Sequence, residues 1–294
     1  LNQNMFLKGW LFNALSNTSI PKVLFMRNEY RTIPRKLEIA RKNNISILVS
    51  QSNSKKMHAI YKEAVGCDVI SIPNTGLNTS MFKPTIARED RKIDIGYRAT
   101  PGPIDFKLGH IERKSIAEYF TNKADQYNIS IDISTDIGKR FNTIEWARFL
   151  NNCKGQIGAE AGYDYFEITD NTRSKVQKYF SENPNSTFEH IYETFYKNYR
   201  NNVPARMISG RNVECAGTKT VQILFEGEYN GYFKPDVHYI PLKKDFTNFD
   251  EAMEKFQDVS FCEEITKNAY DVAKSELTYE KLISNLHSNI LRIL

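Results

Sequence analysis

Charged side chains follow one apolar run of this sequence, at the position where layered α/β proteins commonly bind ligands. Arg98 directly follows the run Ile93–Tyr97, and Lys107, Arg113 and Lys114 come soon after it. A guanidinium can form paired hydrogen bonds with a phosphate, and a departing diphosphate needs nearby cations because it gains negative charge. These residues therefore predict a site for an anionic ligand such as a nucleotide diphosphate. The alternative is that they are ordinary surface cations.

Small residues follow a second apolar run. The run Gly155–Ala159 leads into Glu160-Ala-Gly162, so that Gly158 and Gly162 stand on either side of a carboxylate. Glycines let a ligand approach the backbone closely, and the free amides of a following helix can bind phosphate oxygens. The segment is thus a candidate phosphate-binding turn, although the residues taken alone favour a plain tight turn.

A third candidate lies at the expected start of a helix. Gly210 and Arg211 come at this start, and Glu214 is expected in the first turn. A carboxylate there can accept hydrogen bonds from both ribose hydroxyls of a nucleotide. It can equally complement the helix dipole without any ligand. The residues alone leave both roles of Glu214 open.

The elements that must position these residues follow from the apolar periodicity. Three short apolar runs alternate with helical stretches, which predicts a parallel βαβαβ unit whose strands are buried on both faces. A segment rich in proline and asparagine, 73–84, then predicts a linker and a domain boundary near residue 85. The three runs are Lys22–Met26, Ile45–Val49 and Val69–Ile72.

The second part of the chain is expected to repeat this alternation up to a last helix, Tyr279–Leu294. A polar helical insert at 165–205 carries Phe188, Ile191, Phe195 and Tyr199 on one stripe, which predicts core packing. Strands are expected at 93–97, 129–133, 155–159, 220–225 and 238–242, and helices at 110–123, 144–153, 212–217, 249–257 and 262–274.

The composition fits a globular protein with ample apolar material for a core. Of the 294 residues, 40% are hydrophobic and 26% are charged, with a formal net charge of +5. Scattered charges of both signs favour a mixed surface, and no basic and aromatic patch indicates nucleic-acid binding. The four cysteines have no metal-binding spacing and fit a reduced, cytoplasmic chain.

The sequence gives no sign of membrane insertion or export. No apolar run approaches the ~20 residues that a membrane span needs, and no signal peptide is visible. The chain begins at Leu1 without an initiator Met, and we expect residues to be missing before it.

Four segments occur in an order that resembles group 1 glycosyltransferases of the GT-B type. The first, similar to the interdomain segment "IPNGVDTxxFxP", is Ile72-Pro-Asn-Thr-Gly-Leu-Asn-Thr-Ser-Met-Phe-Lys-Pro84. The second resembles the opening of a bacterial donor domain and comprises Ile93–Arg98, Leu108-Gly and Glu112-Arg-Lys114. The third is similar to the nucleotide-holding "EAxAxGTxxv" unit and runs Glu214-Cys-Ala-Gly-Thr-Lys-Thr-Val-Gln-Ile-Leu. The fourth comprises Phe225–Gly231 and His238–Leu242. The resemblance covers about residues 20–275, and the order of the segments carries it.

This resemblance implies an α/β protein of the GT-B fold, with two Rossmann-like parallel-sheet domains that face a cleft, the first of them truncated. It implies the C-terminal part of an acceptor-side domain at 1–84, a donor domain at 85–275, and a helix at 276–294 that packs back toward the first domain. The activity implied is a hexosyltransferase that uses a nucleotide-sugar, retains the anomeric configuration, and needs no metal ion or cofactor. The acceptor would be a polysaccharide, lipid or protein of a bacterial cell-surface glycan. The enzyme would be cytoplasmic, with peripheral association at the inner face of the membrane.

The resemblance also assigns roles to single residues of the donor side. Glu214 would bind the nucleotide ribose. Arg98 and Lys114 would bind the donor diphosphate, and we expect Gly158, Gly162 and Arg211 to contribute to the same site.

The chain departs from the family in its acidic pair. Members usually carry Glu-x7-Glu ending at the ribose glutamate, but Arg206 stands eight residues before Glu214. We therefore expect Glu160 to serve as the catalytic acid that binds sugar hydroxyls or stabilises charge at the anomeric carbon. On the acceptor side, the segment after the first strand is expected to face the cleft, unless it forms a helix-capping turn. Its residues are Glu29, Tyr30 and Arg31.

The broken acidic pair and the short first domain leave another function open. The chain could be a non-catalytic, nucleotide-sugar-binding or scaffold protein of the same fold. The nearest enzymatic rival is a GT-B epimerase or phosphorylase. A phosphorylase with pyridoxal phosphate needs a dedicated lysine pocket, which the sequence does not indicate.

Overall fold

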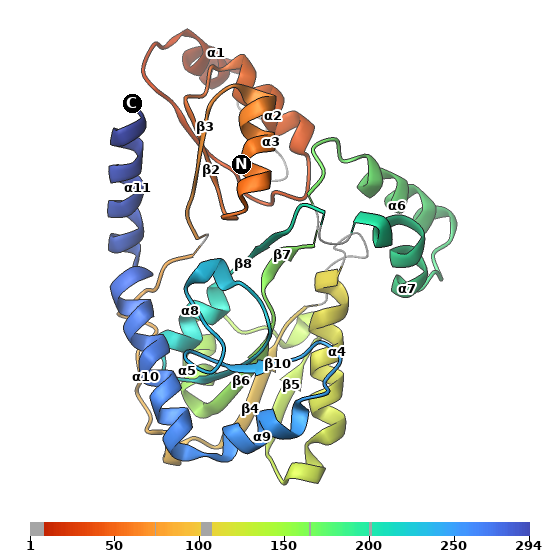
Figure 1. Cartoon of the computed structure of the whole chain (residues 1–294), viewed down its shortest axis with the longest axis vertical. Helices are drawn as coiled ribbons and strands as arrows, with labels where there is room; N and C mark the ends of the chain where they lie inside the picture. The colour runs from red at the N-terminus through yellow and green to blue at the C-terminus, as the bar shows by residue number, and fades with distance from the viewer. Residues whose placement is uncertain (1–8, 74, 101–107, 165, 200–201) are drawn as a thin grey trace. The chain divides into compact units, whose positions relative to one another are not determined.

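The computed structural model describes residues 9–73, 75–100, 108–164, 166–199 and 202–294, and these form two compact units (Figure 1). Unit 1 comprises the described residues of Leu1–Asn74, Gly162–Met207 and Ile283–Leu294. Unit 2 comprises those of Thr75–Ala161 and Ile208–Leu282. The units differ from the expected domains, because the segment 162–207 belongs to unit 1 and the expected boundary near residue 85 falls inside unit 2.

Unit 1 contains a three-stranded parallel sheet in the order β1-β2-β3. Only β2 is buried at every residue, since β1 and β3 lie at the edges of the sheet and Phe25 of β1 is 51% exposed. The prediction that all three strands are buried on both faces is therefore wrong for β1 and β3. The strands are β1 Val23–Phe25, β2 Ile47–Ser50 and β3 Asp68–Ser71, and the helices α1 Gly9–Asn17, α2 Ile33–Lys42 and α3 Lys55–Val65.

The segment 162–207 adds a second layer of structure to unit 1. Two short strands, β7 (Ala161–Tyr163) and β8 (Ala205–Met207), pair with each other. Tyr163, Phe166 and Ala205 are buried in the same core as Met26 and Leu48 of the three-stranded sheet. The segment is therefore part of the unit 1 core.

The expected apolar stripe in this segment is confirmed for Phe188 and Ile191, which are buried, and a break in the helix displaces it after them. After α6 (Asn171–Glu182) and α7 (Phe188–Ile191), the chain forms a π-helix at Tyr192–Tyr196 and a 3-10 turn at Lys197–Tyr199. The wider π turn shifts the helical register. As a result Tyr196 is fully buried, whereas Tyr199, which was expected on the stripe, is 42% exposed.

Unit 2 contains a five-stranded parallel sheet in the order β10-β9-β6-β4-β5. Its strands are β4 Ile93–Arg98, β5 Ile131–Ser134, β6 Cys153–Gly158, β9 Val221–Phe225 and β10 Ile240–Leu242. Its helices are α4 Leu108–Lys123, α5 Thr143–Asn152, α8 Gly210–Gly217, α9 Phe249–Gln257 and α10 Val259–Glu276, with 3-10 turns at Arg88–Asp90, Asp125–Tyr127, Ile137–Lys139 and Tyr229–Gly231.

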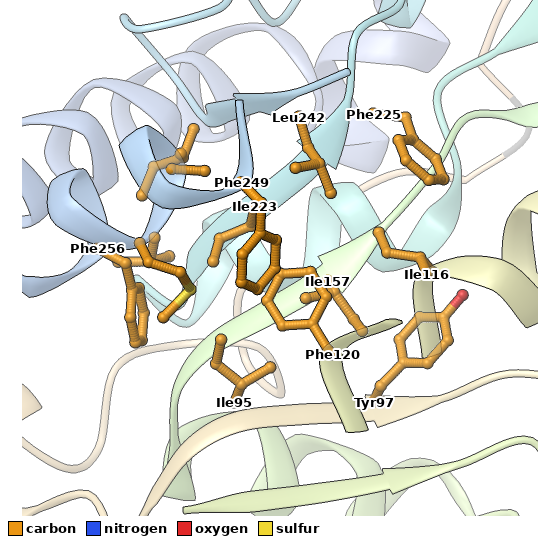
Figure 2. Packing of buried hydrophobic residues seen from close by; sticks show 14 of the residues in the cluster. Ile95, Tyr97, Ile116, Phe120, Ile157, Ile223, Phe225, Leu242, Phe249 and Phe256 are labelled. Atoms are coloured by element: carbon orange, nitrogen blue, oxygen red, sulfur yellow. The ribbon is translucent and has the colours of Figure 1, made fainter. Parts of the chain in front are cut away.

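Helices cover both faces of the unit 2 sheet. Ile95 and Tyr97 of β4 belong to a core that includes Phe120 of α4 and Phe249 of α9 (Figure 2). Successive strand residues point to opposite faces. Gly96 accordingly faces the other way, where an added Cβ would lie 2.7 Å from the ring of Phe149 in α5. The sheet is thus the middle layer of three.

The last helix, α11 (Tyr279–Ile293), contains the division between the units. Leu282 is buried, but Ile283 is 61% exposed and Leu291 63% exposed. The expectation that this helix packs back toward the first domain stays a prediction.

Candidate functional site

A polar pocket lies in unit 2 at the carboxyl ends of the parallel strands β4 and β6, where α/β proteins bind ligands. It has a volume of about 350 Å³. Ser209, the N-cap of α8, brings the positive end of a helix dipole to its wall. We call it the arginine pocket, because four arginines and a single aspartate stand among the described residues that line it. The lining residues are Tyr97, Arg98, Ala99, Thr100, Arg113, Asp136, Arg140, Ala159, Ala161, Ser209 and Arg211.

Arg98 is held firmly at the end of β4. Its Nη1 donates to the backbone oxygens of Asp132 (2.8 Å) and Tyr97 (3.0 Å), and its Nη2 donates to Oδ1 of Asp132 (2.7 Å). Its guanidinium carbon lies 4.9 Å from the centre of the Phe141 ring and 4.7 Å from that of Phe149. The side chain is 11% exposed. Arg98 thus supplies positive charge to the pocket wall while most of its donors are engaged within the protein.

Arg211 projects from the first turn of α8 toward the end of β4. It donates a hydrogen bond to the backbone oxygen of Arg98. Its guanidinium carbon lies 4.7 Å from the centre of the Tyr97 ring and 5.7 Å from that of Trp146. Aromatic faces attract such cations, so the charge of Arg211 is fixed in place between the two rings.

The other two arginines come from separate elements and converge on one residue. Nη1 of Arg113, in α4, donates to the backbone oxygen of Thr100 at 3.4 Å. Nε of Arg140, just before α5, donates to Oγ1 of Thr100 at 2.8 Å. The single aspartate, Asp136, accepts from the backbone amide of Gly138 at 2.8 Å. The pocket therefore has an excess of positive charge suited to an anion.

A second pocket of about 290 Å³ adjoins the first, and Arg98, Arg140 and Arg211 line both. We call it the aromatic pocket, because Phe141 and Trp146 stand in its wall. Among the described residues that line it, Glu214 is the one acidic residue. Two aromatic rings beside a carboxylate and three cations are a combination that can hold a nucleoside next to its phosphates.

Glu214 is oriented by a hydrogen bond from the α5 helix. Nε1 of Trp146 donates to its Oε2 at 2.7 Å. Burial raises the pKa of the Glu214 carboxyl, and the Trp146 bond and the charge of Arg211 oppose that rise. Trp146 in turn is positioned by the start of α5, where Asn142 and Glu145 form a capping box.

The expected place of Glu214 in the first helical turn is wrong. The α8 helix begins at Gly210 with Ser209 as its N-cap, and Asn212 completes a capping box with Ser209. Glu214 is therefore in the second turn, where the helix dipole acts weakly. Its environment is set by burial and by Trp146 instead.

Lys114 is not brought to the arginine pocket. It lies on an exposed face of α4, 59% exposed, with its Nζ 3.8 Å from Oε1 of Glu118. Arg113, its neighbour, lines the pocket instead, because a shift of one residue turns a helical side chain by about 100°. Lys107 lies outside the described residues.

The expected phosphate-binding turn at Gly158 and Gly162 is a strand connection. No helix follows directly, because β7 begins at Ala161. An added Cβ at Gly158 would lie 3.2 Å from Cδ2 of Leu224, and one at Gly162 would lie 2.1 Å from the backbone oxygen of Ala205. Gly162 also has a φ of +83°, which favours glycine. Both glycines are thus explained by packing, and the helix N-terminus at the pocket belongs to α8.

Glu160 accepts hydrogen bonds from the loop that follows β9. Its Oε1 accepts from the backbone amides of Tyr229 (2.7 Å) and Glu228 (3.1 Å). A Cβ at Gly227 would lie 2.5 Å from Oε2 of Glu160, so that glycine permits the close approach. Glu160 does not line the arginine pocket, although Ala159 and Ala161 on either side of it do. Its catalytic role stays a prediction.

Glu29 is buried within unit 1 and does not face an open site. Its carboxylate accepts from Oγ of Ser50 (3.0 Å), the amide of Gln51 (2.7 Å) and the hydroxyl of Tyr61 (2.9 Å). Burial raises its pKa to about 7, against the effect of these hydrogen bonds and of Lys36. Glu29 is thus engaged within unit 1, and the acceptor-side role expected of it stays a prediction.

Its two neighbours are half-buried. The Tyr30 ring meets the ring of Tyr163 edge-on with centres 5.7 Å apart, and the guanidinium of Arg31 lies 5.3 Å from the Tyr30 ring centre. Neither residue lies in either pocket of unit 2.

Another pocket of about 310 Å³ lies at the opposite, amino-terminal ends of the unit 2 strands. Arg88 and Lys154 line it together with three acidic residues, Glu89, Asp94 and Glu263. Lys154 is paired with Asp94 at 2.8 Å. This balanced charge suits an anion less well than the arginine pocket does.

The described residues offer neither a cluster of metal ligands nor a helix that could span a membrane. No three or more His, Cys, Asp or Glu side chains gather there as metal ligands would. No helix in the described ranges combines the length and apolar character needed to cross a membrane.

Solved structures with this arrangement of elements are GT-B glycosyltransferases of group 1. HepE of Anabaena, in complex with UDP-glucose, aligns with 92% of this chain over 72% of its own length, at 10% identity and a TM-score of 0.52. Sucrose-phosphate synthase from Thermosynechococcus elongatus aligns with 97% of this chain over 72% of its own, at 10% identity and a TM-score of 0.53. The chain has the GT-B fold. No protein-family model and no curated protein matches the sequence.

Within this GT-B chain, Arg140, Phe141 and Trp146 are among the pocket residues that the sequence did not single out. Arg140 and Phe141 lie in the connection after β5, where only their position beyond a strand could have indicated a site. Trp146 belongs to α5 and lies half-buried in a pocket wall. Its indole donor beside an aromatic and arginine-rich segment was the available signal.

Proposed function

We propose that this chain is a glycosyltransferase whose nucleotide-sugar donor binds unit 2. The observation that carries the proposal is that Arg98, Arg140 and Arg211 line two adjoining pockets of different character. The arginine pocket suits a diphosphate, and the aromatic pocket suits the attached nucleoside. Glu214 would accept a hydrogen bond from the ribose.

The arginines have a defined task in such a reaction. When the bond between the sugar and the diphosphate breaks, the leaving nucleoside diphosphate gains negative charge. Fixed cations stabilise that charge more effectively than mobile ones, because they need no reorganisation. Arg140 and Arg211 would contact the phosphates directly, while Arg98 adds charge from behind. Because arginines can neutralise the leaving group, we infer a metal-independent reaction without a cofactor.

The finer properties rest on the resemblance of the sequence to group 1 enzymes. We infer transfer of a hexosyl group with retention of configuration, onto a polysaccharide, lipid or protein acceptor of a cell-surface glycan. All four cysteines are free and buried, which fits a reduced, cytoplasmic compartment. The net charge of +5 fits peripheral binding to the anionic inner face of a membrane.

One observation favours a second candidate, a nucleotide-sugar-binding protein without catalysis. The predicted catalytic acid, Glu160, is engaged by the amides of Glu228 and Tyr229. A chain of this kind would bind the donor and release no product.

Release of nucleoside diphosphate from nucleotide-sugars separates the two candidates. The chain is incubated with UDP-glucose, GDP-mannose or ADP-glucose, and the free diphosphate is measured with and without Arg211→Ala. Slow release that depends on Arg211 supports the transferase. Binding of a nucleotide-sugar without release supports the second candidate, and absence of both contradicts the proposal.

A further inference from the structure

The two oxygens of the Glu214 carboxylate have different environments. Oε2 accepts from the indole nitrogen of Trp146 at 2.7 Å. For Oε1, the described residues provide no hydrogen-bond partner, and the side chain lines the aromatic pocket. One oxygen is thus engaged by the protein while the other is left for a ligand.

The donor of this bond is rigidly placed. Trp146 is on α5, whose first turn is fixed by the Asn142 and Glu145 capping box. The Trp146 ring lies 5.7 Å from the ring of Phe149, which is buried. A donor fixed in this way selects one orientation of the carboxylate, because an N–H bond to a charged oxygen weakens steeply when bent.

We infer that Trp146 is a positioning residue that turns Glu214 toward the ribose hydroxyls of the bound nucleotide. This inference rests on the proposed function. Trp146 acts through Glu214: its N–H holds Oε2 and thereby directs Oε1 into the aromatic pocket. The contact with the ligand is then made by a single, preoriented oxygen, which favours a ribonucleotide over its 2′-deoxy analogue.

The same bond controls the ionisation of Glu214. Burial raises the pKa of the carboxyl, whereas the Trp146 N–H and the charge of Arg211 lower it. Arg98 and Arg140 are the other charged groups that line the aromatic pocket. Removing the N–H should raise the pKa of Glu214 further. As the pH is lowered, the variant should therefore lose nucleotide binding at a higher pH than the wild type does.

Trp146→Phe tests the inference because it keeps an aromatic ring beside Arg211 and removes the N–H donor. Calorimetric titration with UDP and with 2′-deoxy-UDP compares wild type, Trp146→Phe, Glu214→Ala and the double variant. We expect Trp146→Phe to weaken UDP binding by about 10- to 20-fold, at the lower end of the range for a lost hydrogen bond to a charged group. The preference for UDP over 2′-deoxy-UDP should shrink. The double variant should bind no more weakly than Glu214→Ala, because Trp146 acts through that carboxylate.

The pH profile of UDP binding separates positioning from simple packing. The phosphates of UDP titrate identically with every variant. If UDP affinity is lost at a higher pH in Trp146→Phe than in the wild type, the difference therefore reports on Glu214. Unchanged UDP affinity in a folded Trp146→Phe, or losses that add in the double variant, would overturn the inference and leave the proposed function standing. If the wild-type chain binds no UDP, GDP or ADP, the proposed function fails and the inference with it.

A measurement that leaves both Trp146 and Glu214 unchanged tests the inference even if Trp146→Phe does not fold. The chain has two tryptophans, so in Trp10→Phe the remaining indole signal in a nitrogen–proton spectrum is that of Trp146. We expect this signal to move as Glu214 titrates and again when UDP is added, and to lose its pH response in Glu214→Ala. An indole signal indifferent to pH and to UDP would overturn the inference.

Discussion

The guanidinium of Arg211 lies over the ring of Tyr97, with 4.7 Å between the guanidinium carbon and the ring centre. A hydrogen bond to the backbone oxygen of Arg98 fixes it further. Because the side chain is already ordered, binding a phosphate costs little of the entropy that a free arginine would lose. Affinity for the nucleotide should therefore depend strongly on this residue.

We predict that Arg211→Ala weakens binding of the nucleoside diphosphate by about 10- to 100-fold, the effect of losing a charged hydrogen bond worth about 1.5–3 kcal/mol. Calorimetric titration measures the change. Lys114→Ala is the matched control, since Lys114 is exposed and paired with Glu118. Equal losses in the two variants would show that general charge, rather than the arginine pocket, holds the ligand.

Glu214→Gln should weaken nucleotide binding at pH 8 by about 1–3 kcal/mol, because the ribose loses a charged acceptor. The amide oxygen can still accept from Trp146, so the fold should persist. Titration of wild type and variant at one pH checks this. Unchanged affinity would remove Glu214 from the ribose site.

The free energies of unfolding of the wild type and of Glu214→Gln should diverge as the pH changes. Burial raises the pKa of Glu214 in the folded chain, so the folded state favours the protonated form. The wild type should therefore lose stability relative to Glu214→Gln as the pH rises through the folded pKa. Melting curves from pH 5 to 8 test the sign, and a relative gain for the wild type would contradict it.

Glu160→Ala should destabilise unit 2 by about 1–3 kcal/mol, because the amides of Glu228 and Tyr229 lose their acceptor. Nucleotide affinity should change little, since Glu160 does not line the arginine pocket. Chemical denaturation and titration together measure both effects. Normal stability combined with lost turnover would favour a catalytic role of Glu160 over a role in holding the loop after β9.

Unit 1 should have its own pH dependence through Glu29. Burial raises its pKa from 4.5 to about 7, so the folded chain holds a proton that the unfolded chain releases. The stabilising contribution of this proton is complete below about pH 4.5 and is lost as the pH rises to about 7. The pKa of Lys36 is lowered to about 8, so Lys36 titrates above this pH range.

The comparison with Glu29→Gln isolates this effect, because glutamine does not titrate. Between pH 5 and 7 the melting temperature of the wild type should fall relative to that of the variant. Parallel curves for the two proteins over this range would contradict a raised pKa at Glu29.

The sequence predicts most strands and helices well because their apolar residues are local signals. The helix at 249–257 and the strand beginning at Ile93 lie where they were expected. The strands β7 (Ala-Gly-Tyr) and β8 (Ala-Arg-Met) were missed because neither is an apolar run, unlike the equally short β1 and β10. Their pairing joins positions about 40 residues apart, which no local pattern reveals.

The candidate site was only partly predictable for a related reason. Arg98, Arg211 and Glu214 follow strands or begin a helix, so their positions were visible in the sequence. Arg140 and Trp146 join them only through tertiary packing at one edge of the sheet. The choice between Arg113 and Lys114 depended on the rotation of α4, which neighbouring charges do not reveal.

Calorimetric titration of the wild-type chain with UDP, GDP and ADP tests the donor-nucleotide site most directly. At least one of the three should bind at one site per chain, and Arg211→Ala should weaken that binding while Lys114→Ala should not. Failure of all three to bind, or binding that is indifferent to Arg211, would contradict a donor-nucleotide site in the arginine and aromatic pockets.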